Sequence, residues 1–166
     1  MKSLVIYSSQ TGNTRKLADA VYETLTGPKK IFTVNDAPDP SGYDFIALGF
    51  WFMSGRPDPG TLEYMSMEYF GNIRGKRLFL FATHGAAVDS LTAEDGMSYA
   101  KMLTSEANIV GKFSCQGEVN PEIIEKARAL REVPEWIAQA PEAANHPNDA
   151  DIEELKRVLC SVIDQS

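Results

Sequence analysis

The stretch Leu4-Val5-Ile6-Tyr7-Ser8-Ser9-Gln10-Thr11-Gly12-Asn13-Thr14 passes from an apolar run into a cluster of hydroxyl, amide and glycine residues, and a helical pattern follows it. This order predicts a buried strand, a turn and a helix start. Backbone N–H groups at a helix N-terminus attract anions, and the hydroxyls of Ser9, Thr11 and Thr14 can add donors. Gly12 permits a positive φ or a close approach of the backbone. The stretch therefore predicts a phosphate site, although an ordinary capped turn fits the same residues.

The composition is that of a globular protein. Its 166 residues are most simply one domain, residues 1–166, and 43% hydrophobic with 23% charged residues argues against disorder. The 23 acidic against 16 basic residues give a formal charge of −7. This charge argues against a nucleic-acid or anionic-membrane surface and suits basic partner proteins.

Two further features of the sequence indicate the cellular compartment of the protein. No apolar run approaches the roughly 18 residues of a membrane span, and the chain opens on a strand pattern instead of a signal-peptide core. Cys115 and Cys160 have neither a metal-binding spacing nor a disulfide pattern. We therefore expect a cytoplasmic protein with reduced, buried thiols, no metal and no membrane contact.

Short apolar runs alternate with helical patterns along the chain. The apolar runs are 4–7, 31–34, 43–52, 76–82 and 109–115. Helices are predicted over 15–25, 61–70, 93–106 and 121–131 and from 148–151 onward, and segment 133–146, with its prolines, is expected to be irregular. This alternation predicts an α/β fold with a parallel sheet that is covered on both faces.

Three loops, 8–14, 50–60 and 83–91, follow predicted strand ends. In a doubly wound sheet the ligand lies beyond the carboxyl ends of the strands, so these loops can meet at one edge. The second loop opens on the aromatic residues Phe50, Trp51 and Phe52, of which at least one is expected in the core because side chains alternate along a strand. From Met53 to Gly60 we expect neither helix nor strand. One site could therefore combine a phosphate pocket with an aromatic slot.

A phosphate bound beside a flat redox ring suggests flavin mononucleotide (FMN), and the same residues resemble a known family. Ser9-Gln10-Thr11-Gly12-Asn13-Thr14 resembles the S/T-x-T-G-x-T phosphate loop of flavodoxins. The resemblance covers nearly the whole chain in strand order, length and loop positions. It implies a flavodoxin-like three-layer α/β/α sandwich with a five-stranded parallel sheet in the order 2-1-3-4-5, and the unbroken fifth strand resembles the short-chain branch.

The resemblance also implies the roles of individual residues, with FMN as cofactor and no catalytic residue. Residues 9–14 would bind the phosphate, and Thr83, His84 and Gly85 would approach the pyrimidine edge and outer face of the ring. The inner face would be covered by Phe50, Trp51, Phe52, Met53, Ser54 and Gly55, with Trp51 as the stacking ring. The chain departs from the family pattern in lacking Trp-Gly-Asp in the second loop and Gly-Asp with a stacking Tyr in the third.

The implied function is one-electron transfer at low potential, from a reductase donor to an oxidoreductase acceptor, by a monomer or weak dimer. A carbonyl within 53–55 would accept a hydrogen bond from N5 of the reduced ring after a peptide flip. The combination of 49–51, 115–117 and 146–148 is similar to a flavodoxin-like subgroup of anaerobic bacteria. Some members of that subgroup accompany a bilirubin-reducing enzyme.

Two other functions stay open. An FMN-dependent NAD(P)H:acceptor reductase of the quinone type would need a nicotinamide site, and the chain has no GxGxxG motif. An accessory flavodoxin-like module would have a weakened flavin site. A receiver domain is excluded, because the first and third strands do not end in carboxylates.

Four further side chains have chemistry that could matter at or near this site. His84 could tune the flavin or lie in a plain loop, and Arg56 has no assigned role. His146 is expected to be structural, and Cys115 to be a buried, inert thiol.

Overall fold

The computed structural model of the protein describes residues 1–87 and 90–164. Residues 88 and 89 of the predicted third loop lie outside the described residues. No helix in the described ranges is long and apolar enough to cross a membrane.

A parallel sheet forms the centre of the molecule. Its strands are β1 (Ser3–Tyr7), β2 (Lys29–Thr33), β3 (Phe45–Met53), β5 (Arg77–His84) and β6 (Asn108–Gln116). They pair in the order β2-β1-β3-β5-β6, which confirms the predicted order 2-1-3-4-5 of the parallel strands. The apolar runs are nearly continuous because both faces of such a sheet are covered.

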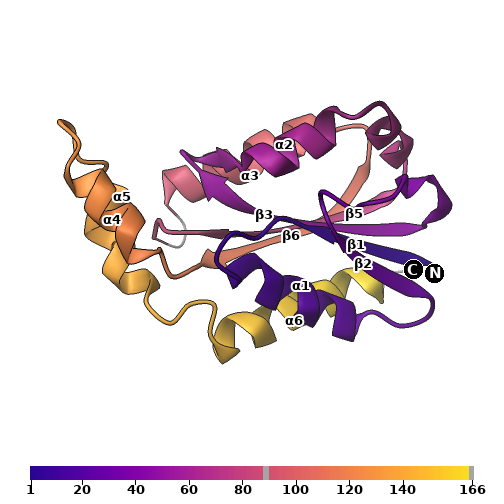
Figure 1. Ribbon diagram of the computed structural model, residues 1–166. Coiled ribbons are helices and arrows are strands. Elements are labelled where there is room, and N and C mark those ends of the chain that lie inside the picture. Colours follow the sequence, from indigo (N-terminus) through magenta and orange to yellow (C-terminus); the bar gives the residue numbers. More distant parts are fainter. Residues whose placement is uncertain (88–89, 165–166) are drawn as a thin grey trace.

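Helices cover both faces of the sheet and complete three layers (Figure 1). Helices α1 (Asn13–Thr24) and α6 (Asp149–Ile163) lie on one face, and α2 (Pro59–Ser66) and α3 (Leu91–Leu103) lie on the other. Each face has its own core cluster, since strand side chains alternate. Phe79 and Phe81 pack on the α1 and α6 side, and Leu78 and Leu80 pack on the opposite side.

The second loop is a tight hairpin, which corrects the prediction of no helix or strand over residues 53–60. Met53 pairs with Arg56 of the two-residue strand β4 (Arg56–Pro57), and α2 already begins at Pro59. The two turn residues have positive φ, 52° at Ser54 and 71° at Gly55. This is the geometry of a two-residue type I′ turn, and its hydrogen bonding extends the strand that was predicted to end at residue 52.

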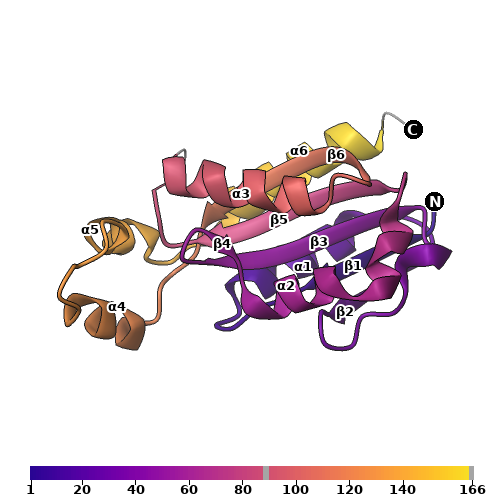
Figure 2. The ribbon, with the colours of Figure 1, turned by 90° about the horizontal axis from the view of Figure 1, so that it is seen from above.

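A segment between β6 and α6 projects beyond the carboxyl edge of the sheet (Figures 1 and 2). We call residues 117–147 the excursion. It contains α4 (Pro121–Arg128), which is the helix predicted over 121–131. The segment 133–146, which was expected to be irregular, contains α5 (Trp136–Gln139) and the 3₁₀ turn η3 (Ala140–Ala143). Outside the excursion, the 3₁₀ turn η1 (Pro40–Gly42) precedes β3, and the 3₁₀ turn η2 (Glu68–Ile73) follows α2.

Candidate functional site

A cavity of about 440 Å³ opens at the carboxyl edge of the sheet. It lies beside the ends of β1 and β3, where the strand order reverses, which is the usual ligand position in this architecture. Its volume falls within the range of about 300–1,000 Å³ found for small-molecule sites. Parts of all three predicted loops line it, together with residues of the excursion.

The predicted site residues line this cavity, apart from Gly12 and Phe50. Gly12 lies on the other side of the first loop, in a neighbouring polar pocket. The Phe50 side chain is fully buried in the core beneath α2 and α3, where it stacks on Phe52, which lies on the same face of β3 and two residues nearer the carboxyl edge. Phe50 therefore belongs to the core, as one of the three aromatic residues was expected to.

The first loop is built around the Ser9 side chain. Its Oγ accepts hydrogen bonds from the backbone N–H groups of Gly12, at 3.2 Å, and of Arg15, at 3.3 Å. Gly12 has φ 95° and begins α1 without a side-chain cap. The left-handed conformation explains the glycine, since other residues adopt it at a cost. The loop therefore places hydroxyl and amide groups at the N-terminus of α1, where the helix dipole favours an anion, and Ser9 Oγ holds two of its backbone N–H groups.

Side-chain hydrogen bonds join the first loop to segments around the cavity. They are Thr14 Oγ1 with Thr83 Oγ1 at 2.9 Å, Ser8 Oγ to Asp58 Oδ1 at 2.7 Å, and Asn13 Nδ2 to the Glu118 carbonyl at 2.9 Å. The segments that they connect lie 50 or more positions apart in the chain. The shape of the first loop is therefore set by the ends of the other strands as well as by its own sequence.

The lining of the cavity carries little charge. Among the described lining residues, Glu118 is the only acidic residue, and none is a lysine or arginine. A phosphate in this cavity would thus be held by hydroxyl, amide and backbone N–H donors. Arg56, whose role was left open, lies with its guanidinium 4.6 Å from the centre of the Tyr99 ring and ties the hairpin to α3.

The aromatic wall comes from the end of β3. Phe52 stacks on the His84 ring, with 5.4 Å between centroids and 19° between planes. On its other side Phe52 packs on Gly96 of α3, where an added Cβ would come within 2.6 Å of the ring. Trp51 points to the opposite side of the strand and is half-buried at the cavity wall. Trp51 therefore offers a flat ring to a ligand, whereas Phe52 is fixed between α3 and His84.

His84 is the last residue of β5 and is almost completely buried. Its Nδ1 lies 2.9 Å from the carbonyl oxygen of Ala86, which can only accept, so Nδ1 carries the proton and donates it. Burial lowers the pKa of His84, and the ring is therefore neutral at pH 7. Its Nε2 is then a hydrogen-bond acceptor that is buried and has no partner among the described residues.

Several lining residues were missed in the sequence. They are Thr92 on α3 and, in the excursion, Gly117, Glu118, Val119, Asn120, Ile123 and Trp136. The available signal was Trp136, a large aromatic residue in a segment of proline, glutamate and alanine. The chain has two tryptophans, and both line this cavity.

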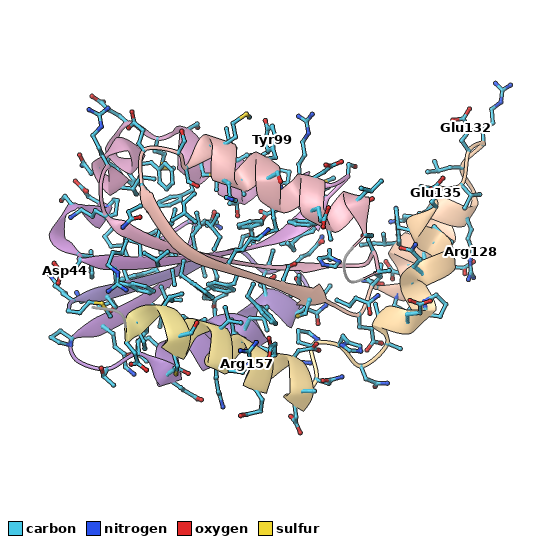
Figure 3. The ribbon with its side chains drawn as sticks, turned by 180° about the vertical axis from the view of Figure 1, so that it is seen from behind. Asp44, Tyr99, Arg128, Glu132, Glu135 and Arg157 are labelled. Carbon is cyan, nitrogen blue, oxygen red and sulfur yellow. The ribbon has the colours of Figure 1, made fainter. Side chains whose placement is uncertain are left out.

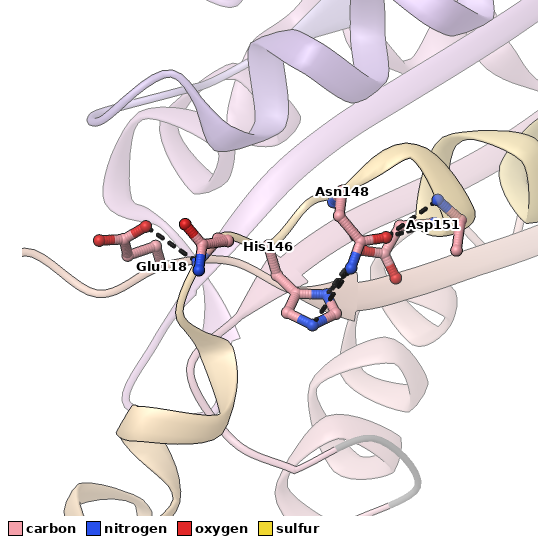
Figure 4. A network of polar contacts seen from close by, with 6 residues as sticks. Glu118, His146, Asn148 and Asp151 are labelled. Carbon is pink, nitrogen blue, oxygen red and sulfur yellow. Dashed lines mark hydrogen bonds and ion pairs between the residues drawn. The ribbon is translucent and has the colours of Figure 1, made fainter.

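The remaining candidate side chains are structural. His146 Nδ1 lies 2.6 Å from Asp151 Oδ2, and Asn148 caps α6, which confirms the structural role expected for His146 (Figure 4). Cys115 is buried and burial raises the pKa of its thiol, so it stays protonated and inert. Among residues 1–87 and 90–164, no group of three or more His, Cys, Asp or Glu could hold a metal ion.

Residues 4–160 match the flavodoxin domain family. The chain belongs to this family. The flavodoxin-like domain-containing protein BilS of Clostridioides difficile (strain CD3) is 30% identical, over 93% of this chain and 92% of its own. A flavodoxin from the domain Archaea superposes with a TM-score of 0.66 at 16% identity, covering 99% of this chain and 98% of its own, and shows the shared flavodoxin fold.

A second solved structure that is similar to this chain contains a bound ligand. It is a flavoprotein of Lactobacillus acidophilus NCFM in complex with FMN, with a TM-score of 0.56 at 16% identity, over 68% of this chain and 92% of its own. The residues of the present cavity fit such a ligand. They provide an uncharged donor-rich loop at one end, a half-buried indole ring beside it, and an unpartnered acceptor at His84 Nε2.

Proposed function

We propose that the protein binds FMN and carries single electrons from a reductase donor to an oxidoreductase acceptor. The observation that carries this proposal is the cavity itself, in which the donor-rich loop 9–14 and the half-buried ring of Trp51 line one space of about 440 Å³. The loop suits the phosphate and the indole suits the flat ring. Bound FMN would supply the redox chemistry, and the protein would supply position and electrostatics.

Each wall then has a defined task. The hydroxyl, amide and backbone N–H groups of the first loop would hold the phosphate at the N-terminus of α1. Trp51, at the cavity wall, would hold the flat ring, and His84 Nε2, which is buried without a partner among the described residues, would accept a hydrogen bond from an N–H group of the cofactor. In the hairpin, the Ser54–Gly55 peptide lies between two residues of positive φ, where a carbonyl can be reoriented toward the ring at low cost because Gly55 tolerates both conformations.

The charge distribution favours a strongly reducing carrier. Glu118 is the charged group at the cavity, and the whole chain has a formal charge of −7. Adding negative charge to a bound ring is disfavoured in such surroundings, which lowers the reduction potential. Residues 117–151 hold eight acidic against three basic side chains, and Glu132 and Glu135 are exposed on the excursion (Figure 3). Partners with basic docking surfaces suit this side of the molecule.

The decisive experiment separates a carrier from an enzyme. The protein is reconstituted with FMN, reduced stepwise in an electrochemical cell, and assayed for oxidation of NADH and NADPH with a quinone acceptor. We expect two separate one-electron steps and no turnover of either nucleotide by the protein alone. Rapid turnover would assign the NAD(P)H:acceptor reductase function instead, and absence of flavin binding would leave an accessory module.

A further inference from the structure

The excursion forms a wall of the cavity that the sheet and its covering helices do not provide. It leaves the sheet at Gly117, immediately after β6, and returns at the start of α6. Between these points it contributes Val119, Ile123 and Trp136 to the cavity lining. These three residues form the apolar part of a wall to which Glu118 and Asn120 also contribute, and Trp136 supplies its aromatic ring.

The base of the excursion is fixed by hydrogen bonds (Figure 4). Glu118 N–H donates to the carbonyl of His146 at 2.8 Å, and the N–H of Asn145 donates to Glu118 Oε2 at 3.0 Å. His146 in turn contacts Asp151 in the first turn of α6. The outgoing and returning ends are thereby held together and to the helix, which positions the wall relative to the sheet.

The third loop holds α5 directly. The N–H of Ala87 donates to Gln139 Oε1 at 2.8 Å. Trp136 and Gln139 are three positions apart in one helical turn, so their side chains leave the same face of α5. The bond that holds Gln139 therefore also sets the direction of Trp136.

Gly85 leaves room for this arrangement. A Cβ at this position would lie 2.6 Å from Val119 Cγ2 and 3.7 Å from Trp136 Cε3. The third loop thus presents bare backbone, and Val119 and Trp136 close against it. The Trp136 side chain therefore lies directly beside the third loop.

We propose that Trp136 is a second ring-contacting residue, supplied by the excursion, and that Gln139 is its positioning residue. This inference rests on the proposed binding of FMN. Flat aromatic rings gain free energy from contact with one another, and Trp136 lines the same cavity as Trp51. Trp136 touches the ring and not the phosphate, so it supports the binding of FMN and of riboflavin to the same extent.

The test compares the dissociation constants of FMN and riboflavin for the wild type and for variants. Trp136→Ala should weaken the binding of both flavins by about tenfold and leave the ratio of their constants unchanged. Trp136→Phe should restore most of the affinity. Gln139→Ala should weaken the binding of both flavins by a smaller factor. Gln139→Glu should bind them more tightly than Gln139→Ala does, because its carboxylate still accepts from the Ala87 N–H group. Val133→Ala, at an exposed position of the excursion outside the cavity, is the matched control and should bind both flavins like the wild type.

Flavin fluorescence gives a second readout, because contact with an indole quenches it. In the background Trp51→Phe the bound flavin should stay quenched, and it should become fluorescent when Trp136→Phe is added. Wild-type affinities in Trp136→Ala, or equal flavin fluorescence in Trp51→Phe and in the double variant, would overturn the role of Trp136. Either result would leave the proposed binding of FMN intact. Failure of the wild type to bind either flavin would instead overturn the proposed function.

Discussion

The hydroxyl oxygens of Thr14 and Thr83 lie 2.9 Å apart and are buried. Thr14 stands in the first turn of α1 and Thr83 near the end of β5, 69 positions later. One bond therefore fixes the start of the predicted phosphate-binding helix to the strand that carries the third loop. Both residues also line the cavity, so this bond sets the distance between two of its walls.

The threonine pair should show strong coupling in unfolding experiments. Thr14→Val and Thr83→Val each leave one buried hydroxyl unpaired and should each lower the free energy of unfolding by about 1–3 kcal/mol. The double variant should cost less than the sum of the two, because no unpaired hydroxyl remains. Urea denaturation of the four proteins measures the coupling, and strictly additive losses would show that the hydroxyls do not bond.

Gly85 should tolerate no side chain. Gly85→Ala places a Cβ against Val119, so we expect a loss of about 1–3 kcal/mol in unfolding free energy and weaker flavin binding as the excursion is displaced. The control is Gly71→Ala, since a Cβ there meets nothing within 4 Å and φ is not positive. That variant should unfold within about 1 kcal/mol of the wild type. Equal stability of the two variants would contradict the close contact at Gly85.

His84 should make stability depend on pH. Its pKa in the folded protein is lowered below 6.5 by burial, so below this pH the unfolded chain binds more protons than the folded one. The free energy of unfolding should consequently fall as pH decreases through 6.5 toward the folded-state pKa, and His84 should contribute no dependence well above 6.5, where the ring is neutral in both states.

Urea denaturation above and below pH 6.5 tests this dependence. His84→Gln should be less stable overall, because it loses the stacking with Phe52, but should show a smaller loss on acidification than the wild type. His146→Gln serves as the comparison and should retain the contribution of His84. An unchanged pH dependence in His84→Gln would contradict the assignment.

The hydroxyl of Ser9 should affect the affinity for FMN and not the affinity for riboflavin. Ser9→Ala removes the acceptor of the Gly12 and Arg15 N–H groups, so the loop loses its shape and FMN should bind about tenfold more weakly. Riboflavin, which lacks the phosphate, should bind as before. Ser161→Ala, at an exposed hydroxyl on α6, controls for the substitution and should leave both affinities unchanged. Equal losses for the two flavins would place the loop away from the phosphate.

Much of the architecture could be predicted, because its signals are local. The alternation of apolar runs and helical patterns predicted the parallel sheet, and the resemblance to flavodoxins implied its strand order. Parts of the three predicted loops, 8–14, 50–60 and 83–91, line one cavity at the edge where they were expected to meet. These segments follow strand ends directly, and parallel strands bring such ends together whatever the side chains are.

The parts that could not be predicted depend on contacts between distant residues. The orientation of Trp51 rather than Phe50 toward the cavity depends on strand register, and a shift of one residue would exchange them. The position of Trp136 depends on Gln139 reaching Ala87, 52 positions away, and on the bare backbone of Gly85. The hairpin was missed because Ser54 is not a typical residue for positive φ.

The most direct test of the account is a titration of the purified, colourless protein with FMN and with riboflavin, followed by the visible spectrum and by calorimetry. The account predicts tight 1:1 binding of FMN, with riboflavin bound about tenfold or more weakly because the donors of loop 9–14 then lack their phosphate. Two results would contradict the account. Binding of neither flavin would show that the cavity is not a flavin site, and equal affinity for both would show that loop 9–14 is a structural turn that does not bind the phosphate.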